Sequence, residues 1–84
     1  MNTGNRKTLQ AVFADPVNGN IEWRKIESLL KALGCEIIET GGSRIAIVYE
    51  GKKATFHRPH PGKEALRYRV SAVRDFLELI GKKP

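Results

Sequence analysis

The chain has 84 residues, of which 40% are hydrophobic and 29% are charged. This length suits one small domain, and the composition is typical of a folded protein rather than a disordered one. No apolar run approaches the roughly 20 residues needed to cross a bilayer, and the N-terminal residues lack the apolar core of a secretory signal. Cys35 is the only cysteine, which excludes an intramolecular disulfide and a cysteine-rich zinc site. These observations favour the cytoplasm and no membrane association.

The net charge of +6 is concentrated in one part of the chain. Residues 51–74 contain seven basic residues and one acidic residue, and seven minus one gives +6. The first fifty residues balance at six and six, and the last ten balance at two and two. A local cationic field favours polyanions, either nucleic acid or an acidic protein surface. The simpler interpretation is a solvated face that keeps the protein soluble.

Two helices are predicted first along the chain. A short helix over residues 5–14 ends at Asp15-Pro16, and a second helix spans residues 21–33. Asn20 is its expected N-cap and Gly34 its expected C-terminal stop. The second helix has one broad apolar face, made of Trp23, Ile26, Leu29, Leu30 and Leu33.

Three strands and a last helix follow. The strands are predicted over residues 35–39, 43–50 and 52–57, from their β-branched content and alternation. The last helix is predicted from about Val70 to Ile80, with Ser71 as a partial cap and Gly81 as its end. The order is α-α-β-β-β-α, which predicts an α+β fold. A three-stranded antiparallel sheet with both main helices on one face would bury their apolar stripes and leave its other face open.

The turn between the second and third strands sets which residues face each other. Glu50-Gly51-Lys52-Lys53 suits a two-residue hairpin loop with glycine at the first central position, which pairs Glu50 with Lys53. Arg44 is then opposite Pro59 and is a diagonal neighbour of His57 on the open face. The opposite, core face receives Ile45, Ile47, Tyr49 and Phe56.

His57 and His60 are the only histidines, and they lie within the basic segment. RNA cleavage needs a base for the 2′-hydroxyl, an acid for the leaving oxygen, and cations for the developing charge. Histidine and arginine have these chemistries, yet basic patches often bind without cleaving. A metal site is a poorer interpretation, because His57 and His60 are only two ligands, no cysteine is near, and Pro59 and Pro61 prevent a regular helical histidine pair.

The run GNIEWRKIESLLKALGCEIIETGGSRIAIVYEGKKATFHRPHPGKE, followed by VRDFLELIG, resembles the HicA toxin family. The resemblance covers about residues 19–81, and its most distinctive part is His60-Pro61-Gly62-Lys63-Glu64. It implies a fold like a double-stranded-RNA-binding domain in residues 19–84, preceded by an extension over residues 1–18. It also implies a toxin that cleaves mRNA without a metal or other cofactor and that a HicB-type antitoxin neutralises.

The resemblance implies a catalytic histidine directly after Gly-Ser at the start of the second strand, where this chain has Arg44. Three alternatives follow. His57 takes over from the neighbouring strand, His60 serves instead, or the protein binds RNA or antitoxin and cleaves nothing. An endoribonuclease is the leading hypothesis, and a non-catalytic binding module is the alternative.

Several basic residues are candidate RNA contacts, and Tyr68 could either stack on a base or cover the last helix. The candidate contacts are Arg44, Lys52, Lys53, Arg58, Lys63, Arg67 and Arg69.

Overall fold

The computed structural model describes residues 1–84 and contains three helices and one sheet. The helices are α1 (Thr3–Val12), α2 (Trp23–Ala32) and α3 (Arg67–Leu79), and the strands are β1 (Glu36–Gly41), β2 (Arg44–Tyr49) and β3 (Lys52–His57). The sheet is antiparallel, with the strand order β1-β2-β3. The predicted α+β fold is therefore confirmed, with its α-β-β-β-α order after an extra N-terminal helix. None of the three helices has the length and hydropathy of a membrane-spanning segment.

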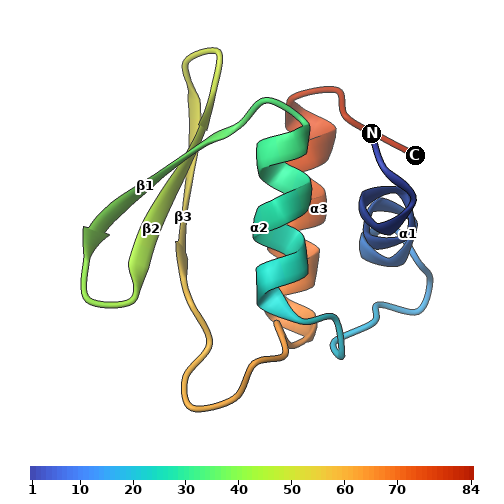
Figure 1. Ribbon diagram of the computed structural model, residues 1–84, viewed down its shortest axis with the longest axis horizontal. Helices are drawn as coiled ribbons and strands as arrows, with labels where there is room; N and C mark the ends of the chain where they lie inside the picture. The colour runs from blue at the N-terminus through green and yellow to red at the C-terminus, as the bar shows by residue number, and fades with distance from the viewer.

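The elements form three layers, with the sheet on one side of α2 and α3 and with α1 on the other side (Figure 1). Both main helices bury their apolar faces against the same side of the sheet, and no element covers its other side. Trp23 is 4% exposed and its ring lies 5.6 Å from that of Phe56. Trp23 therefore belongs to the core, as its place on the apolar face of the second helix predicts.

The helix α1 packs on α2 and α3 through Leu9 and Val12, which are buried. Arg74 of α3 holds the C-terminal end of α1 in place. The Arg74 guanidinium donates to the carbonyl oxygens of Val12 (3.0 Å) and Ala14 (2.7 Å). These carbonyls have no partner within the helix, so the arginine satisfies groups that would otherwise need water. At the other end, the Asn2 side chain accepts from the Asn5 backbone N–H.

Helix α1 lies two residues earlier than predicted, at 3–12 rather than 5–14, and the predicted starts of the two main helices are also wrong. Glu22 rather than Asn20 precedes α2, and α3 begins at Arg67, three residues before Val70, so that Ser71 lies inside the helix. The reason is a tertiary contact, since residues 19–23 lie against residues 63–66. The backbone N–H of Trp23 donates to the Lys63 carbonyl oxygen (2.9 Å), and the backbone N–H of Ala65 donates to the Ile21 carbonyl oxygen (2.7 Å). Helix ends predicted at Gly34 and Gly81 are confirmed, and both glycines have positive φ.

The predicted hairpin register is also wrong, by two residues. Tyr49 pairs with Lys52, so Glu50 and Gly51 form the two-residue turn, with φ of 47° and 82°. Positive φ at both central positions defines a type I′ turn. Arg44 is therefore directly opposite His57 rather than opposite Pro59. A shift of two preserves which face each side chain occupies, so the predicted core face of Ile45, Ile47, Tyr49 and Phe56 remains.

The chain ends both emerge on the α1 side of the molecule, away from the sheet (Figure 1).

Candidate nucleic-acid interface

Several chain segments that are distant in sequence meet at one end of the molecule, which we call the histidine end: residues 19–24, 41–44 and 57–69. The Arg58 N–H donates to the Ser43 carbonyl at 2.8 Å, which joins the end of β3 to the β1–β2 turn. The N-terminal ends of α2 and α3 point the same way (Figure 1). Because helix N-termini carry partial positive charge, they add to the field of the basic side chains.

The central feature of this end is the cross-strand pair of Arg44 and His57. The two residues are direct partners in the β2–β3 register, and both are exposed on the open face of the sheet. Cβ atoms of direct partners are about 4.5–5.5 Å apart, closer than the predicted diagonal arrangement. The Arg44 Nε also donates to the Thr40 hydroxyl at 3.3 Å, which directs its guanidinium toward the β1 edge of the pair.

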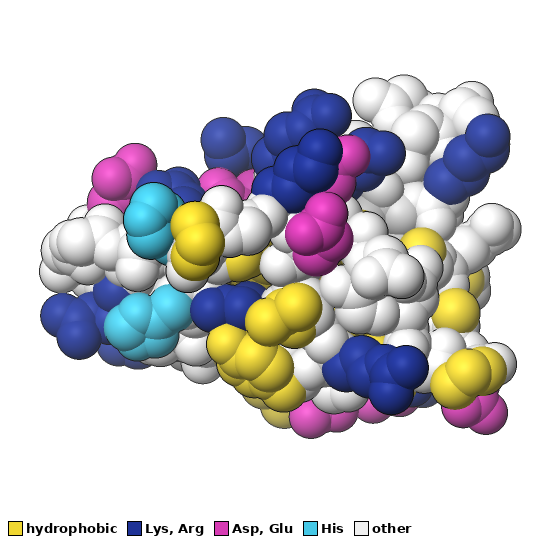
Figure 2. Space-filling model, turned by 90° about the horizontal axis from the view of Figure 1, so that it is seen from below, with side chains coloured by type: hydrophobic (Ala, Val, Ile, Leu, Met, Phe, Trp, Pro, Cys, Tyr) yellow, Lys and Arg dark blue, Asp and Glu magenta, His cyan; other side chains and the backbone are white.

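The two histidines line one shallow hollow of about 570 Å³. Figure 2 shows them on the same face of the molecule, among Lys and Arg side chains and close to hydrophobic ones. The hollow is also lined by six other polar or aromatic side chains: Ser43, Thr55, Phe56, Arg58, Tyr68 and Arg69. The sequence stretch that separates His57 from His60 therefore folds so that both face one space.

Arg69 holds the α3 side of this hollow in place. Its Nε donates to the His57 carbonyl oxygen (2.7 Å) and its Nη1 donates to the Ala65 carbonyl oxygen (3.2 Å). The guanidinium carbon lies 4.8 Å from the centroid of the Tyr68 ring. Tyr68 is 64% exposed, so it does not cover the last helix.

Arg58, a predicted RNA contact, instead forms an ion pair inside the molecule. Its Nε and Nη2 donate to the two carboxylate oxygens of Glu27 at 2.8 and 3.1 Å, and Glu27 also accepts from the Trp23 indole at 2.5 Å. Burial disfavours the charged carboxylate of Glu27, but these hydrogen bonds and the charge of Arg58 outweigh it and lower its pKa. Arg58 therefore fastens β3 to α2 and has little capacity left for a ligand.

The family described as HicA toxin of bacterial toxin-antitoxin has a sequence model that matches residues 23–81, more than half of the chain. The chain belongs to the HicA toxin family. It is accordingly a toxin of a toxin–antitoxin system, with an antitoxin as its partner. Comparisons with curated proteins and with solved structures give no match.

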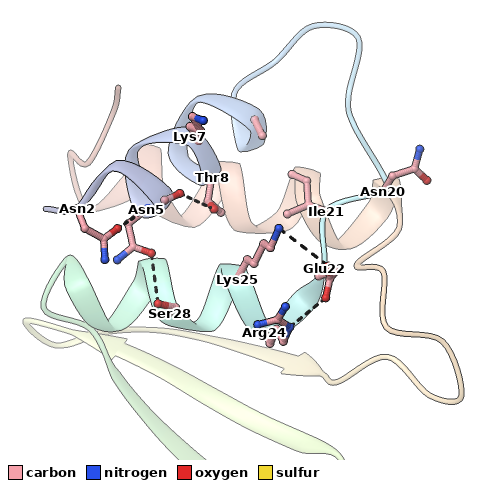
Figure 3. Close-up of a pocket in the computed structure, with 12 residues that line it drawn as sticks. Asn2, Asn5, Lys7, Thr8, Asn20, Ile21, Glu22, Arg24, Lys25 and Ser28 are labelled. Carbon is pink, nitrogen blue, oxygen red and sulfur yellow. Dashed lines mark hydrogen bonds and ion pairs between the residues drawn. The ribbon is translucent and has the colours of Figure 1, made fainter.

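The part of the chain that matches the HicA family begins with α2 and ends just after α3. The helix α1 therefore lies before it. A polar hollow of about 480 Å³ is lined by residues of α1 and α2, and Figure 3 shows these side chains. Its polar groups bond largely to each other: Ser28 donates to Asn5 (3.3 Å), and Glu22 accepts from Arg24 (3.0 Å). The hydrogen bond from Arg24 and its charge lower the pKa of Glu22.

Two more predicted RNA contacts of this HicA protein lie away from the histidines. Lys52 and Lys53 begin β3 while His57 ends it. At about 3.3 Å per residue, Lys53 is some 13 Å from His57 along the strand. Lys53 shares the open face with His57 because residues two apart point the same way. Lys52 lies beside the hairpin turn at the opposite end of the sheet (Figure 1).

A second basic hollow, of about 610 Å³, lies on the α2 side of the histidine end. It is lined by the predicted contact Lys63 and also by Arg24 and Lys31, which were not among the predicted contacts. Their spacing of seven residues places them on the same face of a helix, and this is the signal that could have identified them. Arg67 lies outside both hollows, against Gly19.

No group of three or more His, Cys, Asp or Glu side chains comes together in this chain in a way that could hold a metal ion. Cys35 is buried, and burial raises the pKa of its thiol. It therefore behaves as a small hydrophobic residue rather than as a ligand or nucleophile.

Proposed function

We propose that this HicA family protein is an RNA-directed toxin that cleaves mRNA without a metal ion, at the hollow lined by His57 and His60. The observation that carries the proposal is the direct cross-strand pairing of Arg44 with His57. The family resemblance implies a catalytic histidine at the position of Arg44. An imidazole on the neighbouring strand, facing the same side, can reach much of the same space.

The proposed chemistry is an attack within the RNA chain. One histidine removes the proton of a 2′-hydroxyl, the 2′-oxygen attacks the adjacent phosphorus, and the bond from phosphorus to the 5′-oxygen breaks. A protonated group then donates a proton to that leaving oxygen. The products are a 2′,3′-cyclic phosphate and a 5′-hydroxyl. No metal or redox partner is required.

Each group has a proposed role in this scheme. His57 is the proton-transfer group beside Arg44, and His60, which lines the same hollow, is the second. The guanidinium of Arg44 stabilises the charge that develops on the phosphate oxygens, as a fixed fork of donors does. Lys63 and Lys53 contact phosphates further along the strand.

The decisive experiment is incubation of purified protein with RNA in EDTA, which removes contaminating metal-dependent nucleases. Wild type is compared with His57→Ala, His60→Ala and the control Lys83→Gln, which changes an exposed cation in the C-terminal tail. General acid–base groups contribute about 10²–10⁴-fold, so we expect a loss of that size for His57→Ala and none for Lys83→Gln. Cleavage that survives both histidine substitutions would falsify the assignment of these residues.

The alternative function is a module that binds RNA or antitoxin and cleaves nothing. The observation that favours it is Arg44 itself, because a guanidinium binds phosphate but does not exchange protons near neutral pH. It predicts RNA binding that weakens steeply with salt while the RNA stays intact. The cleavage assay in EDTA and a binding assay on the same preparation separate the two functions.

We also propose that a HicB-type antitoxin neutralises the protein by covering the histidine end. The charge excess of residues 51–74 favours an acidic partner surface. Expression of the protein alone should halt growth, and co-expression of its antitoxin should restore it. An antitoxin that binds equally well to wild type and to the Lys63→Glu variant would contradict the proposed position of this contact.

A further inference from the structure

Tyr68 is unusual among the aromatic residues of this chain. Trp23, Phe56 and Phe76 are each at least 94% buried, whereas Tyr68 is 64% exposed. It is the most exposed of the large hydrophobic side chains. The core does not use this ring, so apolar surface of the ring is available to a ligand.

One face of the Tyr68 ring is contacted by the neighbouring residue Arg69. The Arg69 guanidinium lies 4.8 Å from the ring centroid. That guanidinium is itself held by the carbonyl oxygens of His57 and Ala65. A guanidinium occupies one face of a ring, and the large exposed fraction of Tyr68 leaves the other face open. The result is an exposed aromatic platform of the kind on which bases stack.

The platform shares its hollow with the groups of the proposed reaction. Tyr68 and Arg69 line the same space of about 570 Å³ as His57 and His60. This volume lies within the range of small-molecule sites. The Arg69 Nη2 has no partner within the protein, since only Nε and Nη1 are used, and Ser43 adds a hydroxyl to the same wall. Aromatic, cationic and hydroxyl groups together match the base and phosphate of one nucleotide.

We propose that Tyr68 and Arg69 form a subsite that stacks one unpaired nucleobase beside the phosphodiester approached by the histidines. This inference rests on the proposed function, and it deepens it by naming the substrate class. A base that stacks on a protein ring has left its own helical stack. The preferred substrate is therefore single-stranded or looped RNA rather than a continuous duplex.

The test measures binding of short RNA oligomers in which 2′-O-methyl groups remove the attacking hydroxyl. Wild type is compared with Tyr68→Phe, which keeps the ring, and with Tyr68→Leu, which keeps apolar bulk without a flat face. Leu79→Ala is the matched control, because Leu79 is 59% exposed on α3 and lies outside the hollow. Melting curves of all variants check that each is folded.

Loss of one base–aromatic contact typically weakens binding by about 5- to 150-fold. We expect Tyr68→Leu to weaken single-strand binding by about 10-fold or more, while Tyr68→Phe and Leu79→Ala stay within about 2-fold of wild type. Duplex binding should be equal in all four proteins. A second series replaces the nucleotides of the single strand one at a time by an abasic unit. At one position this replacement should weaken binding to wild type by about 10-fold or more, and at the same position it should leave binding to Tyr68→Leu unchanged.

Three results overturn the subsite. In the first, Tyr68→Leu binds single strands as well as wild type does. In the second, Tyr68→Phe loses as much affinity for single strands as Tyr68→Leu. In the third, Tyr68→Leu weakens only antitoxin binding. The last result would assign the ring to the protein interface. These outcomes differ from failure of the proposed function, in which wild type itself neither binds nor cleaves RNA and the subsite falls with it.

Discussion

Glu27 and Arg58 are joined by two hydrogen bonds, and their side chains are only 14% and 33% exposed. A basic residue in a charged segment is a reasonable candidate for a phosphate contact, and sequence alone gives no sign that Arg58 turns inward. The deciding partner, Glu27, is 31 positions away in the chain. Only the tertiary fold brings it near.

This ion pair predicts a loss of stability in acid. The pKa of Glu27 is lowered from its ordinary 4.5 in the folded protein, so the unfolded chain takes up the proton first as pH falls. The stabilisation is thus complete above pH 4.5 and disappears as pH drops through the folded value. We expect Glu27→Gln to lower the free energy of unfolding by about 2 kcal/mol at pH 7, and by a smaller amount at pH 3, which lies below the unfolded pKa. Urea denaturation at both pH values measures this, and an equal loss at both would contradict it.

The pairing of Arg44 with His57 predicts a rescue. If the imidazole works equally well from either strand, then the double variant with His57→Ala and Arg44→His should recover cleavage that His57→Ala loses. We expect recovery of at least about 10-fold, a small part of the usual contribution of a general base. Cleavage of a labelled RNA in EDTA measures it. The variant with His57→Ala and Arg44→Gln is the control, and equal activity in the two double variants would argue against the exchange.

At the scale of elements, the β2–β3 hairpin shows what sequence patterns fix and what they leave open. Alternation in residues 43–50 is enough to assign the two faces of the sheet. The alternation does not determine the turn type, because Gly51 suits either the first or the second central position of a two-residue loop. The two possibilities differ by two residues in register, so the faces are predicted correctly while the partner of Arg44 is not.

The same hairpin predicts a stabilising substitution. Glu50 has φ of 47°, a conformation that is unfavourable for most residues with a side chain and that Asn adopts more readily. We expect Glu50→Asn to raise the free energy of unfolding by about 0.5–1 kcal/mol. Thermal denaturation provides the measurement, and Lys53→Asn on the adjacent strand should not stabilise. A lower melting temperature for Glu50→Asn would contradict the turn assignment.

The starts of α2 and α3 could not be predicted for a related reason. The sequence offers Asn20 and Ser71 as good capping residues, but the backbone contact between residues 19–23 and 63–66 determines where both helices begin. Local capping preference is worth about 1 kcal/mol. A set of tertiary hydrogen bonds with the burial of Ile21 and Ala65 exceeds it.

The attachment of α1 gives a third stability prediction. Arg74→Gln removes the charged donor from the carbonyl oxygens of Val12 and Ala14. We expect a loss of about 1–3 kcal/mol, the usual cost of breaking hydrogen bonds to a charged group. Urea denaturation measures the loss, with Lys83→Gln as the control for removal of one positive charge. An unchanged midpoint would mean that α1 does not contribute to the cooperative unit.

For the whole molecule, the sequence correctly locates the charge excess, and the fold then divides the cations by availability. Lys63 is exposed, whereas Arg58 is engaged with Glu27. The salt dependence of RNA binding distinguishes them, since each phosphate contact contributes about 0.7–0.9 to the slope of log affinity against log salt. We expect Lys63→Gln to reduce the slope by about that amount and Arg58→Gln to leave it unchanged. Fluorescence anisotropy over a salt series measures both slopes, and equal reductions would contradict this division.

The chain ends both emerge beside α1, on the far side of the molecule from the sheet (Figure 1). A tether at either end, to a bead, a sensor surface or a fluorescent reporter, would hold the protein with its open sheet face turned outward. Single-molecule and surface-based measurements of RNA capture are therefore feasible without rebuilding the chain. The same geometry allows a second protein to be fused at either terminus without blocking access to the histidines.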